Sequence, residues 1–544
     1  MLNYIWTFLI FLGLAAAIST DVANKFSDRH RNGKSVELIA FFPNQPAIKS
    51  GDLLSFPAVM SAQFYNKTYG DSITGDIRFS VKTKFLPNQW TTAVLLIPEN
   101  APLVIKEIAK STGEDNDIVA KLSYVPGGIT GINVVFEEVN YYKMKEVTNS
   151  ALGYADTAVT IAIGLIGIMA MWLGIMKIAE ESGVINSFAR LLRPITRFLF
   201  PDVPHDHPAI GSIVMNLAAT ILGLGNAATP LGIKAMEDLN SLNPDKGVAT
   251  NAMCTFLVLN TASFALMPTT AIALRAAAGS PKPAIIIGTT MFGSFIATMV
   301  GIIAVKVFEK FSGNKETPGN EIKNKLRVKK IIIPVAAIAS FLVLYLIGFF
   351  RLLGSLFSFM SFDFLRTGIE IISTLAIPSM IVGFVALGFW KKVKVYETFI
   401  EGAKEGFNVA VMIIPYLVAI LMAIGIFRSG GAMNWLVQIL APVTDLIGMP
   451  AEALPMALMR PLSGSGSLGI MAEIIAVHGP DSFIGILVST MYGSTETTFF
   501  VLAVYFGAVN VKNTRHALPA GLISDLAGLL AALLIVRLLY PAGL

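Results

Sequence analysis

Two stretches of the chain share one unusual pattern. Residues 225–237 read GNAATPLGIKAME, and residues 462–474 read LSGSGSLGIMAEI. Each is a small, polar, glycine-rich stretch that leads into Leu-Gly-Ile and a helix-like tail, and each lies amid apolar sequence. Within a membrane, irregular backbone is tolerated only where protein buries it or where it lines a cavity. Paired interruptions at matching places in two halves also point to a transport site. The chain is therefore predicted to contain a duplicated, broken membrane segment.

The composition excludes a soluble protein. Hydrophobic residues make up 54% of the chain and charged residues only 14%, whereas about 25% of a typical soluble domain is charged. The net charge of +5 comes from basic residues that cluster in loops, a pattern of membrane orientation and not of nucleic-acid binding. Apolar runs of about 20 residues, long enough to cross a bilayer, predict a polytopic membrane protein with segments near 1–19, 152–178, 209–225, 250–274, 284–305, 331–350, 371–390, 407–427, 483–507 and 517–540.

The N-terminal part of the chain has a different pattern. Residues 1–20 are interpreted as a retained first transmembrane helix, because they lack the positive region that begins a signal peptide. Residues 21–146 are polar and rich in turn residues, and in the stretch DIRFSVKTKF apolar Ile77, Phe79 and Val81 alternate with polar residues. This alternation is typical of a half-buried strand. With VELIAFF, TTAVLLIP and INVVFEEV as further strands, residues 21–146 predict a small β-rich inserted domain.

The remaining sequence repeats itself. Four segments of the first half recur in the same order in the second half, at separations of roughly 235–250 residues. We therefore divide this part into a first repeat (147–305) and a second repeat (371–544). The pairs are 152–174 with 401–423, 182–196 with 429–444, the two Leu-Gly-Ile segments, and 259–274 with 493–508.

The segment between the repeats predicts their orientation. Residues 306–330 form a lysine-rich linker, which the positive-inside rule places in the cytoplasm. An extra transmembrane helix and loop (331–370) then has no counterpart in the first half, and one extra crossing would make the repeats inverted. This topology places the β-rich insert outside the cytoplasm. Four basic residues directly after the first helix favour the opposite side: Lys25, Arg29, Arg31 and Lys34.

One carboxylate stands out as a candidate for chemistry. Glu496 lies in GSTETT, within an apolar region, and an ionisable group at membrane depth is expected to face a cavity or a partner. The hydroxyls of the same motif can hydrogen-bond a polar solute or bind a coupling cation, either a proton or sodium. They belong to Ser494, Thr495, Thr497 and Thr498. The alternative is a carboxylate in a short loop that caps the next helix.

The interrupted segments supply a second group of candidates for binding a solute or ion. Their glycines allow the backbone to open, and the following helix presents unpaired N–H groups and its positive dipole end. Packing of small residues between helices would enrich the same residue types. The candidates are Asn226, Thr229, Ser463, Ser465 and Ser467, with Asn260, Thr261 and Ser263 of the NTAS motif facing GSTETT.

No resident cofactor or metal site is predicted. The single cysteine, Cys254, excludes a disulfide framework. The segment PDVPHDHP (201–208) brings histidines and carboxylates together, but its prolines favour a loop with Asp206 as the N-cap of the next helix.

Several motifs resemble the bacterial spore maturation proteins A and B. The first half does so in WLGIMKIAEESG, GLGNAATPLGIKAME and FLVLNTASFALMPTTAIALR, and the second in IIPYLV, RPLSGSGSLGIMAE and GSTETTFFVLAVYFGAV. The resemblance implies a nucleoside-recognition or gate domain in each half and a role in maturing the spore core. It also implies kinship with concentrative nucleoside transporters, whose substrate lies between re-entrant hairpins and unwound helices. The positions implied for this chain are Asn226, Thr229, Ser463, Ser465, Thr495 and Glu496.

The expected fold is therefore an all-α polytopic inner-membrane protein, with two inverted gate-type repeats containing re-entrant or broken helices and a small β-rich insert. The expected partners are the bilayer and a small, nucleoside-like polar solute, and a homo-oligomer is left open. The main alternative is a non-transporting assembly or spore-envelope factor whose β insert binds an envelope protein. An enzyme is not expected, because no acid–base or nucleophile pair is evident in the sequence.

Overall fold

The computed structural model describes residues 2–540 apart from 42–50, 85, 87–88, 113–115, 125–130 and 312–361. The side chains of some further residues, among them 225–227, are also outside the described part. The helix predicted at 331–350 and most of the linker at 306–330 fall in the undescribed range. The chain divides into two compact units. The membrane unit comprises Met1–Trp6, Gly153–Ile424 and Leu436–Leu544, and the insert unit comprises Thr7–Leu152 and Gly425–Trp435.

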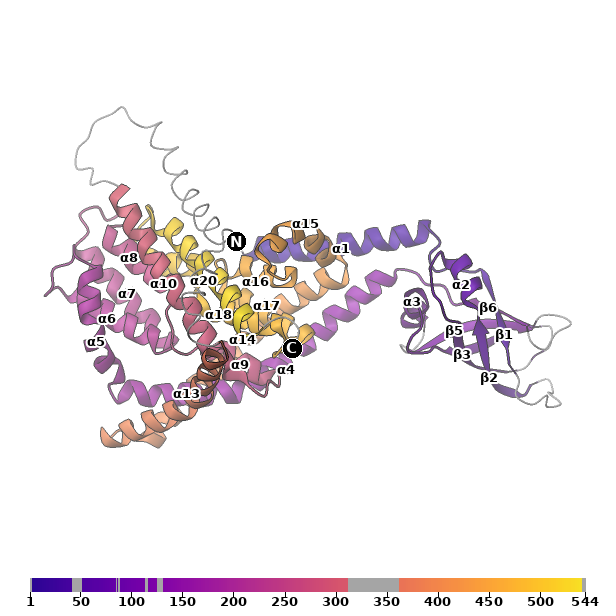
Figure 1. The fold of residues 1–544 in the computed structure, drawn as a ribbon, viewed down its shortest axis with the longest axis horizontal. Helices are drawn as coiled ribbons and strands as arrows, with labels where there is room; N and C mark the ends of the chain where they lie inside the picture. Colours follow the sequence, from indigo (N-terminus) through magenta and orange to yellow (C-terminus); the bar gives the residue numbers. More distant parts are fainter. Residues whose placement is uncertain are drawn as a thin grey trace, which may run out of the picture. The chain divides into compact units, whose positions relative to one another are not determined.

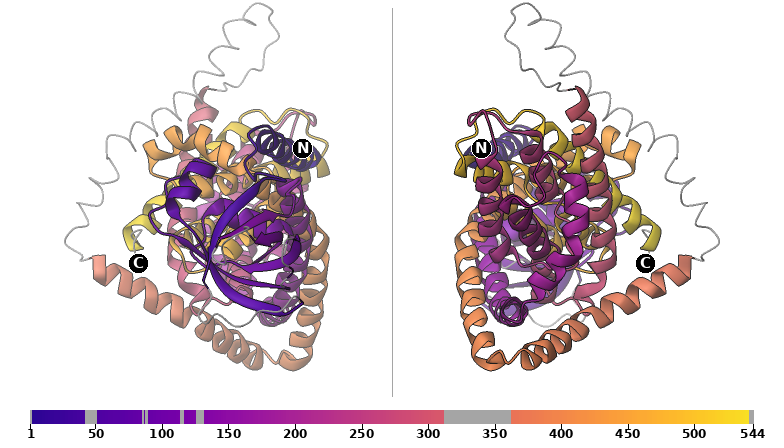
Figure 2. Two further views of the ribbon diagram at one scale, coloured as in Figure 1. Left: turned by 90° about the vertical axis from the view of Figure 1, so that its right-hand side faces the viewer. Right: turned by 90° about the vertical axis from the view of Figure 1, so that its left-hand side faces the viewer.

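The inserted domain is a closed barrel of six antiparallel strands (Figures 1 and 2). The strands follow one another around the barrel in their order along the chain, and β6 pairs with β1 to close it. Closure leaves no exposed sheet edge. Helix α2 (Ala62–Tyr69) lies between β2 and β3, and α3 (Leu103–Thr112) between β4 and β5. The strands are β1 (Ser35–Ala40), β2 (Leu53–Met60), β3 (Ile77–Lys84), β4 (Thr91–Leu96), β5 (Asp117–Tyr124) and β6 (Gly131–Phe136).

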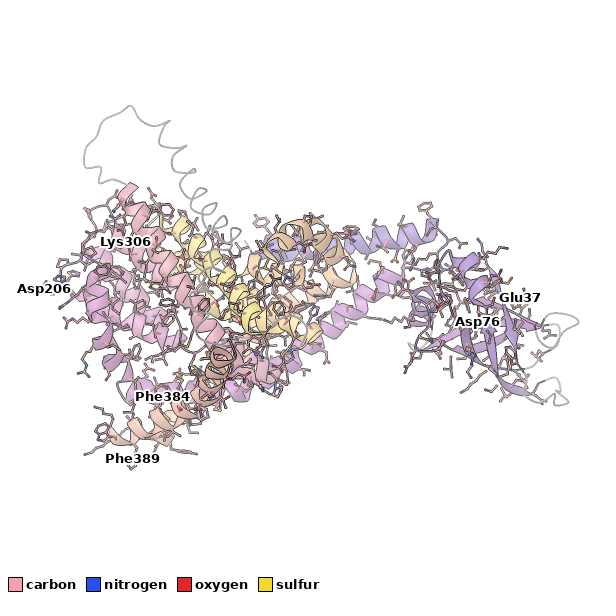
Figure 3. The ribbon with its side chains drawn as sticks, in the orientation of Figure 1. Glu37, Asp76, Asp206, Lys306, Phe384 and Phe389 are labelled. Carbon is pink, nitrogen blue, oxygen red and sulfur yellow. The ribbon has the colours of Figure 1, made fainter. Side chains whose placement is uncertain are left out.

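Alternating side chains build the barrel core. On β3, Ile77, Phe79 and Val81 are buried while the residues between them are exposed, as predicted. On β1, Glu37 faces outward between buried neighbours (Figure 3). Ile105 of α3 joins the same apolar core as the inward-facing strand residues. The prediction of a β-rich insert is confirmed, although it missed β2, β5 and both helices.

A buried carboxylate anchors α3 beside the barrel. Glu107 accepts hydrogen bonds from Arg29, from Nε at 2.9 Å and from Nη2 at 3.1 Å. Nε2 of the buried His30 lies 3.1 Å from the same carboxylate. Burial raises the pKa of Glu107, but the hydrogen bonds to His30 and Arg29 outweigh burial and lower it from 4.5 to about 2. The folded insert therefore holds this group as a carboxylate.

We expect Glu107 to make the insert sensitive to acid. Because its pKa is lower in the folded than in the unfolded chain, its contribution is complete above about pH 5. The contribution is lost as the pH falls towards 2. Hydrogen–deuterium exchange of insert peptides should show Glu107→Gln less stable than wild type near pH 7, by on the order of 2 kcal/mol. This difference should shrink at pH 3. The exposed Glu37→Gln is the matched control, and a difference that does not change with pH would contradict the prediction.

Most of the membrane unit consists of two series of helices in matching order. Apart from the third pair, corresponding helices have similar lengths, and the predicted duplication extends over seven elements of each half (Figure 1). The first series is α4 (Tyr142–Glu181), α5 (Val184–Leu199), α6 (Pro208–Ile221), α7 (Gly225–Ser241), α8 (Asn251–Ala262), α9 (Thr269–Ala277) and α10 (Ile286–Phe311). The second is α14 (Val395–Ser429), α15 (Ala432–Ile447), α16 (Leu454–Met459, after a 3-10 turn at Ala451–Ala453), α17 (Gly464–His478), α18 (Phe483–Ser494), α19 (Thr498–Ala508) and α20 (Ala517–Leu539).

Three predicted membrane segments are wrong as continuous spans. The run 209–225 is broken between α6 and α7, the run 250–274 between α8 and α9, and the run 483–507 between α18 and α19. The Leu-Gly-Ile helices, α7 and α17, also follow interruptions. Each half therefore contains two interrupted segments where the sequence predicted one.

A smaller correction concerns the start of α6. Its N-cap is His207, whose Nδ1 accepts a hydrogen bond from the Ala209 N–H at 3.2 Å, and not the predicted Asp206. Asp206 lies in the preceding loop (Figure 3).

The long helices have the dimensions of membrane spans. Among the described residues, six helices are long and apolar enough to cross a membrane. They are Trp6–Phe26, Tyr142–Glu181, Pro283–Lys310, Thr367–Trp390, Val395–Ser429 and Ala517–Leu539. Helix α13 (Phe362–Trp390) lies along the outside of the membrane unit (Figure 2). Its Phe389 is 80% exposed and points away from the neighbouring helices (Figure 3), as expected for a side chain in lipid.

Four helices form the centre of the membrane unit. Among the described helices, α10 and α20 pack together most extensively, and both also pack against α8 and α18. The two halves therefore interlock through corresponding elements, because α10 corresponds to α20 and α8 to α18. This arrangement holds the α8–α9 and α18–α19 breaks at the interface between the halves.

Candidate functional site

The interrupted helices are joined to one another by backbone hydrogen bonds. In the first half, the N–H of Leu266 donates to the carbonyl of Ile221 at 2.8 Å. In the second half, the N–H of Phe499 donates to the carbonyl of Pro461 at 3.1 Å. Each bond links the chain just before a Leu-Gly-Ile helix to the chain at the other break of the same half, or in the first helical turn after it. The two halves thus use the same internal connection.

A further bond joins the halves themselves. The N–H of Glu496 in the α18–α19 break donates to the carbonyl of Thr261 at the end of α8, at 2.8 Å. The NTAS and GSTETT motifs, which the sequence comparison paired, are therefore in direct contact.

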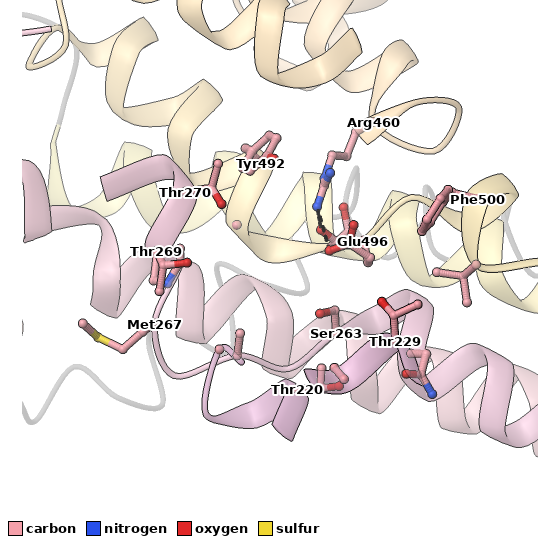
Figure 4. Close-up of a pocket in the computed structure, with 18 of the residues that line it drawn as sticks. Thr220, Thr229, Ser263, Met267, Thr269, Thr270, Arg460, Tyr492, Glu496 and Phe500 are labelled. Atoms are coloured by element: carbon pink, nitrogen blue, oxygen red, sulfur yellow. Dashed lines mark hydrogen bonds and ion pairs between the residues drawn. The ribbon is translucent and has the colours of Figure 1, made fainter. Parts of the chain in front are cut away.

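A cavity of about 260 Å³ opens where these breaks meet (Figure 4). This volume is just below the range of about 300–1,000 Å³ typical of small-molecule sites, so it suits one small solute and not a polymer. Both halves contribute to its wall. The polar residues that line it are Thr220, Thr229, Asn260, Ser263, Thr269, Thr270, Arg460, Tyr492, Thr495, Glu496 and Tyr505.

Local backbone conformation explains the breaks. Ser263 ends α8 in the left-handed region with φ 45°, a conformation that is uncommon for a residue other than glycine. Gly223, with φ 80°, precedes α7, and a Cβ added there would lie 3.1 Å from the carbonyl oxygen of Met267. Thr495 is extended, with φ −144°. These three positions turn the chain into the cavity.

Arg460 is the main organiser of the second-half wall. Its side chain is only 3% exposed, and Nη2 donates to the carbonyl of Thr495. Nη1 lies 3.5 Å from Oγ1 of Thr497, and the guanidinium lies over the ring of Tyr492, 4.4 Å from its centroid. Nε has no hydrogen-bond partner among the described residues. The cavity therefore has a buried cation at its edge with an N–H that is still unpaired.

Glu496 pairs with this cation. One carboxylate oxygen lies 3.4 Å from Nη2 of Arg460, and the side chain is 44% exposed as it faces the cavity (Figure 4). The capping alternative does not describe its position, because the N-cap of α19 is Thr497. Arg460 and Glu496 are the only charged residues in the described lining, and both come from the second half. The first half contributes hydroxyl, amide and apolar groups.

Tyr505 forms another part of the wall. Its hydroxyl donates to Oδ1 of Asn260 at 3.3 Å, and its ring stacks on Phe256 with centroids 5.8 Å apart. A Cβ on Gly232 of α7 would overlap the Tyr505 hydroxyl, so the glycine of the first Leu-Gly-Ile motif makes room for this side chain. The motif therefore has a packing role beside the cavity.

The predicted site residues do not all line the cavity. Those that do are Thr229, Asn260, Ser263, Thr495 and Glu496. Other predicted residues are buried without lining it: Thr261, Ser467, Ser494, Thr497 and Thr498. The side chain of Asn226 lies outside the described part of the structure.

The serines of the second interrupted segment mainly support α17. Ser463 is its N-cap, and its hydroxyl accepts a hydrogen bond from the Gly466 N–H at 3.0 Å. The hydroxyl of Ser467 donates back to the carbonyl of Ser463, and Ser465 lies beside Ser463, 3.4 Å between hydroxyls. None of these serines is among the described residues that line the cavity.

The sequence reasoning missed Arg460, Tyr492 and Tyr505. For Arg460 a signal was present, because an arginine just before the PLSGSGS stretch is an ionisable group between apolar segments. The two tyrosines carry no such signal, because aromatic residues are common in membrane helices.

Comparisons with known proteins find similarity in both halves of the membrane unit. Residues 162–278 and 410–512 each match a gate family model described as nucleoside recognition. Spore maturation protein B of Bacillus subtilis (strain 168) is 51% identical over 177 residues, which are 32% of this chain and 99% of that protein. Spore maturation protein A of the same organism is 44% identical over 180 residues, 33% of this chain and 91% of that protein. The chain belongs to the spore maturation A and B family.

A spore maturation A-like part and a B-like part are thus combined in one chain, consistent with a fusion. The inner membrane protein YjiG of Escherichia coli (strain K12) is also similar, with 31% identity over 102 residues, 18% of this chain and 65% of that protein. No solved structure matches the chain significantly. The apolar helices and these relatives identify a multi-pass protein of the inner membrane.

Proposed function

We propose that this spore maturation A/B fusion recognises and transports a small, nucleoside-like polar solute across the inner membrane. The observation that carries the proposal is the cavity at the meeting point of the interrupted helices of both halves. A site shared between two repeats can open to either side when the repeats move against each other. Inverted repeats and alternating access are part of this proposal.

The lining supports a solute of this class. Tyr492, Phe500 and Tyr505 offer aromatic faces, on which a planar base can stack. Thr229 and Asn260 offer hydroxyl and amide groups, which suit the hydroxyls of a sugar. The gate model that matches both halves is described as nucleoside recognition. The Arg460–Glu496 pair is close to neutral overall, so it favours an uncharged polar solute.

A ligand screen by thermal shift tests the proposal. The detergent-purified full-length protein is unfolded in the presence of nucleosides, bases, amino acids or simple cations. At a hundred times its dissociation constant, a ligand that binds only the folded state stabilises it by about 2.7 kcal/mol. We expect a nucleoside to raise the unfolding temperature, and no effect of any nucleoside on a folded sample would contradict the proposed solute class.

Two conservative variants test whether the ligand binds in the cavity. Thr229→Val and Tyr505→Phe each remove one hydroxyl from the lining with little change in shape. Each is expected to weaken nucleoside binding about tenfold, the effect of losing about 1.4 kcal/mol. Thr157→Val on α4 is the control, because its hydroxyl donates to the Gly153 carbonyl and Thr157 is not among the described residues of the lining.

The same variants separate transport from the role of an assembly factor. The inserted barrel is part of a separate compact unit, which could bind an envelope protein. In a complementation assay, a transporter loses function with Tyr505→Phe. An assembly factor loses function when residues 27–140 are replaced by a short flexible linker, while Tyr505→Phe has no effect.

A further inference from the structure

A second polar centre lies behind the cavity, on α20. Asp525 is only 1% exposed and lies near the middle of this apolar helix. One of its carboxylate oxygens, Oδ2, accepts a hydrogen bond from the Thr498 hydroxyl at 2.5 Å. The other, Oδ1, has no hydrogen-bond partner among the described residues, and no described lysine, arginine or histidine forms an ion pair with it. An ionised carboxylate in such surroundings costs several kcal/mol unless a positive charge neutralises it.

The α18–α19 break lies against the face of α20 that carries Asp525. Positions 521, 525 and 528 share one helix face. A Cβ on Gly528 would lie 2.5 Å from Cγ2 of Thr495 and 3.3 Å from the carbonyl oxygen of Ser494. A Cβ on Gly521 would lie 3.1 Å from Cγ2 of Thr498. The two glycines therefore bring the break onto α20 on either side of Asp525.

The break also carries a buried hydroxyl on a residue that packs against this face, because Cγ2 of Thr495 contacts α20 at Gly528. Oγ1 of Thr495 is buried and, like Oδ1 of Asp525, has no hydrogen-bond partner among the described residues. Helix α18 ends at Ser494, and the last carbonyls of a helix are unpaired and carry its negative dipole end. In membrane transporters, unwound carbonyls and the C-terminal ends of half-helices coordinate Na⁺, and hard cations take oxygen ligands such as carboxylates.

We propose that Asp525, Thr495 and the carbonyl end of α18 form a sodium site behind the solute cavity. Thr498 holds Oδ2 of the carboxylate and leaves Oδ1 for the ion. The cation site itself does not depend on the proposed transport function. Coupling between the cation and the solute does rest on the proposed transport function, and Thr495 would provide it because Thr495 lines the cavity and also faces α20.

The test measures unfolding of the full-length protein without any solute, in NaCl or in choline chloride at constant ionic strength. We expect the unfolding temperature to rise and saturate with Na⁺. Asp525→Asn, which is nearly isosteric, should abolish this rise. Thr495→Val should lower the apparent Na⁺ affinity at least tenfold, and it provides the test if Asp525→Asn does not fold. The exposed Asp206→Asn is the control and should respond as wild type.

Three results would overturn the proposal. One is an unchanged Na⁺ response in folded Asp525→Asn. Another is the absence of a Na⁺ response in wild type. The third is stabilisation of wild type by acid alone that Asp525→Asn abolishes, which would make the neutralising cation a proton. Tyr505→Phe should keep the Na⁺ response even where it weakens nucleoside binding, so failure of the solute proposal is distinguishable from failure of the sodium site.

Discussion

Replacing Arg460 with alanine is expected to abolish solute binding and to destabilise the membrane unit by about 3 kcal/mol or more. The guanidinium is buried and bonds to the carbonyl of Thr495, to Thr497 and to Glu496. Removing it leaves a carbonyl and a carboxylate without their cation, and unpaired groups of this kind cost more than the bonds themselves contribute. It also removes the contact over Tyr492. The α18–α19 break is then expected to lose its fixed conformation.

Two measurements check this expectation. Thermal unfolding of the purified variant gives the loss of stability, and the nucleoside screen gives the loss of binding. Arg460→Lys is the matched variant, since it keeps the charge but cannot bond to several acceptors in one plane. It should recover part of the stability and little of the binding. An Arg460→Ala protein that unfolds at the wild-type temperature and still binds solute would show that Arg460 does not organise the site.

The strand pattern of the insert could be predicted where alternation was complete. Ile77, Phe79 and Val81 identify β3 because nothing interrupts the period of two. Strand β2 was missed because it contains Pro57, and a proline within a run argues against a central strand. In the barrel Pro57 pairs with Ser80 of β3 within the ladder. The closure of six strands depends on pairing between β1 and β6, about 95 residues apart in sequence, and no local pattern carries that information.

The duplication could be predicted from order and spacing, but the number of breaks could not. Interruptions rich in glycine and serine are visible in the sequence at 225–237 and 462–474. The breaks after Ala262 and Ser494 lie in runs that remain apolar overall, so hydropathy reads each as one span. Asp525 was missed for a related reason, because one carboxylate in a 23-residue apolar helix changes the mean hydropathy little.

Replacing Gly528 with valine is the second change expected to have a large effect. A Cβ at this position would lie 2.5 Å from Cγ2 of Thr495 and 3.1 Å from Cβ of Ala297 on α10. Since α10 and α20 form the most extensive helix pair of the membrane unit, neither neighbour can move without disturbing the interface between the halves. Overpacking of this kind costs about 1–3 kcal/mol. The side chain would also push the α18–α19 break away from α20.

Thermal unfolding with and without Na⁺ checks this prediction. Gly528→Val should unfold at a lower temperature than wild type and should bind Na⁺ more weakly, because Thr495 is displaced from Asp525. Gly507→Val on α19 is the matched control, since a Cβ there meets no atom of the described residues within 4 Å and the cost is limited to the helix propensity of valine. Equal unfolding temperatures for the two variants would mean that the close approach of α20 to the break does not hold the halves together. A loss of stability and of Na⁺ affinity, both confined to Gly528→Val, would instead support this contact as the point where the solute cavity and the α20 carboxylate are joined.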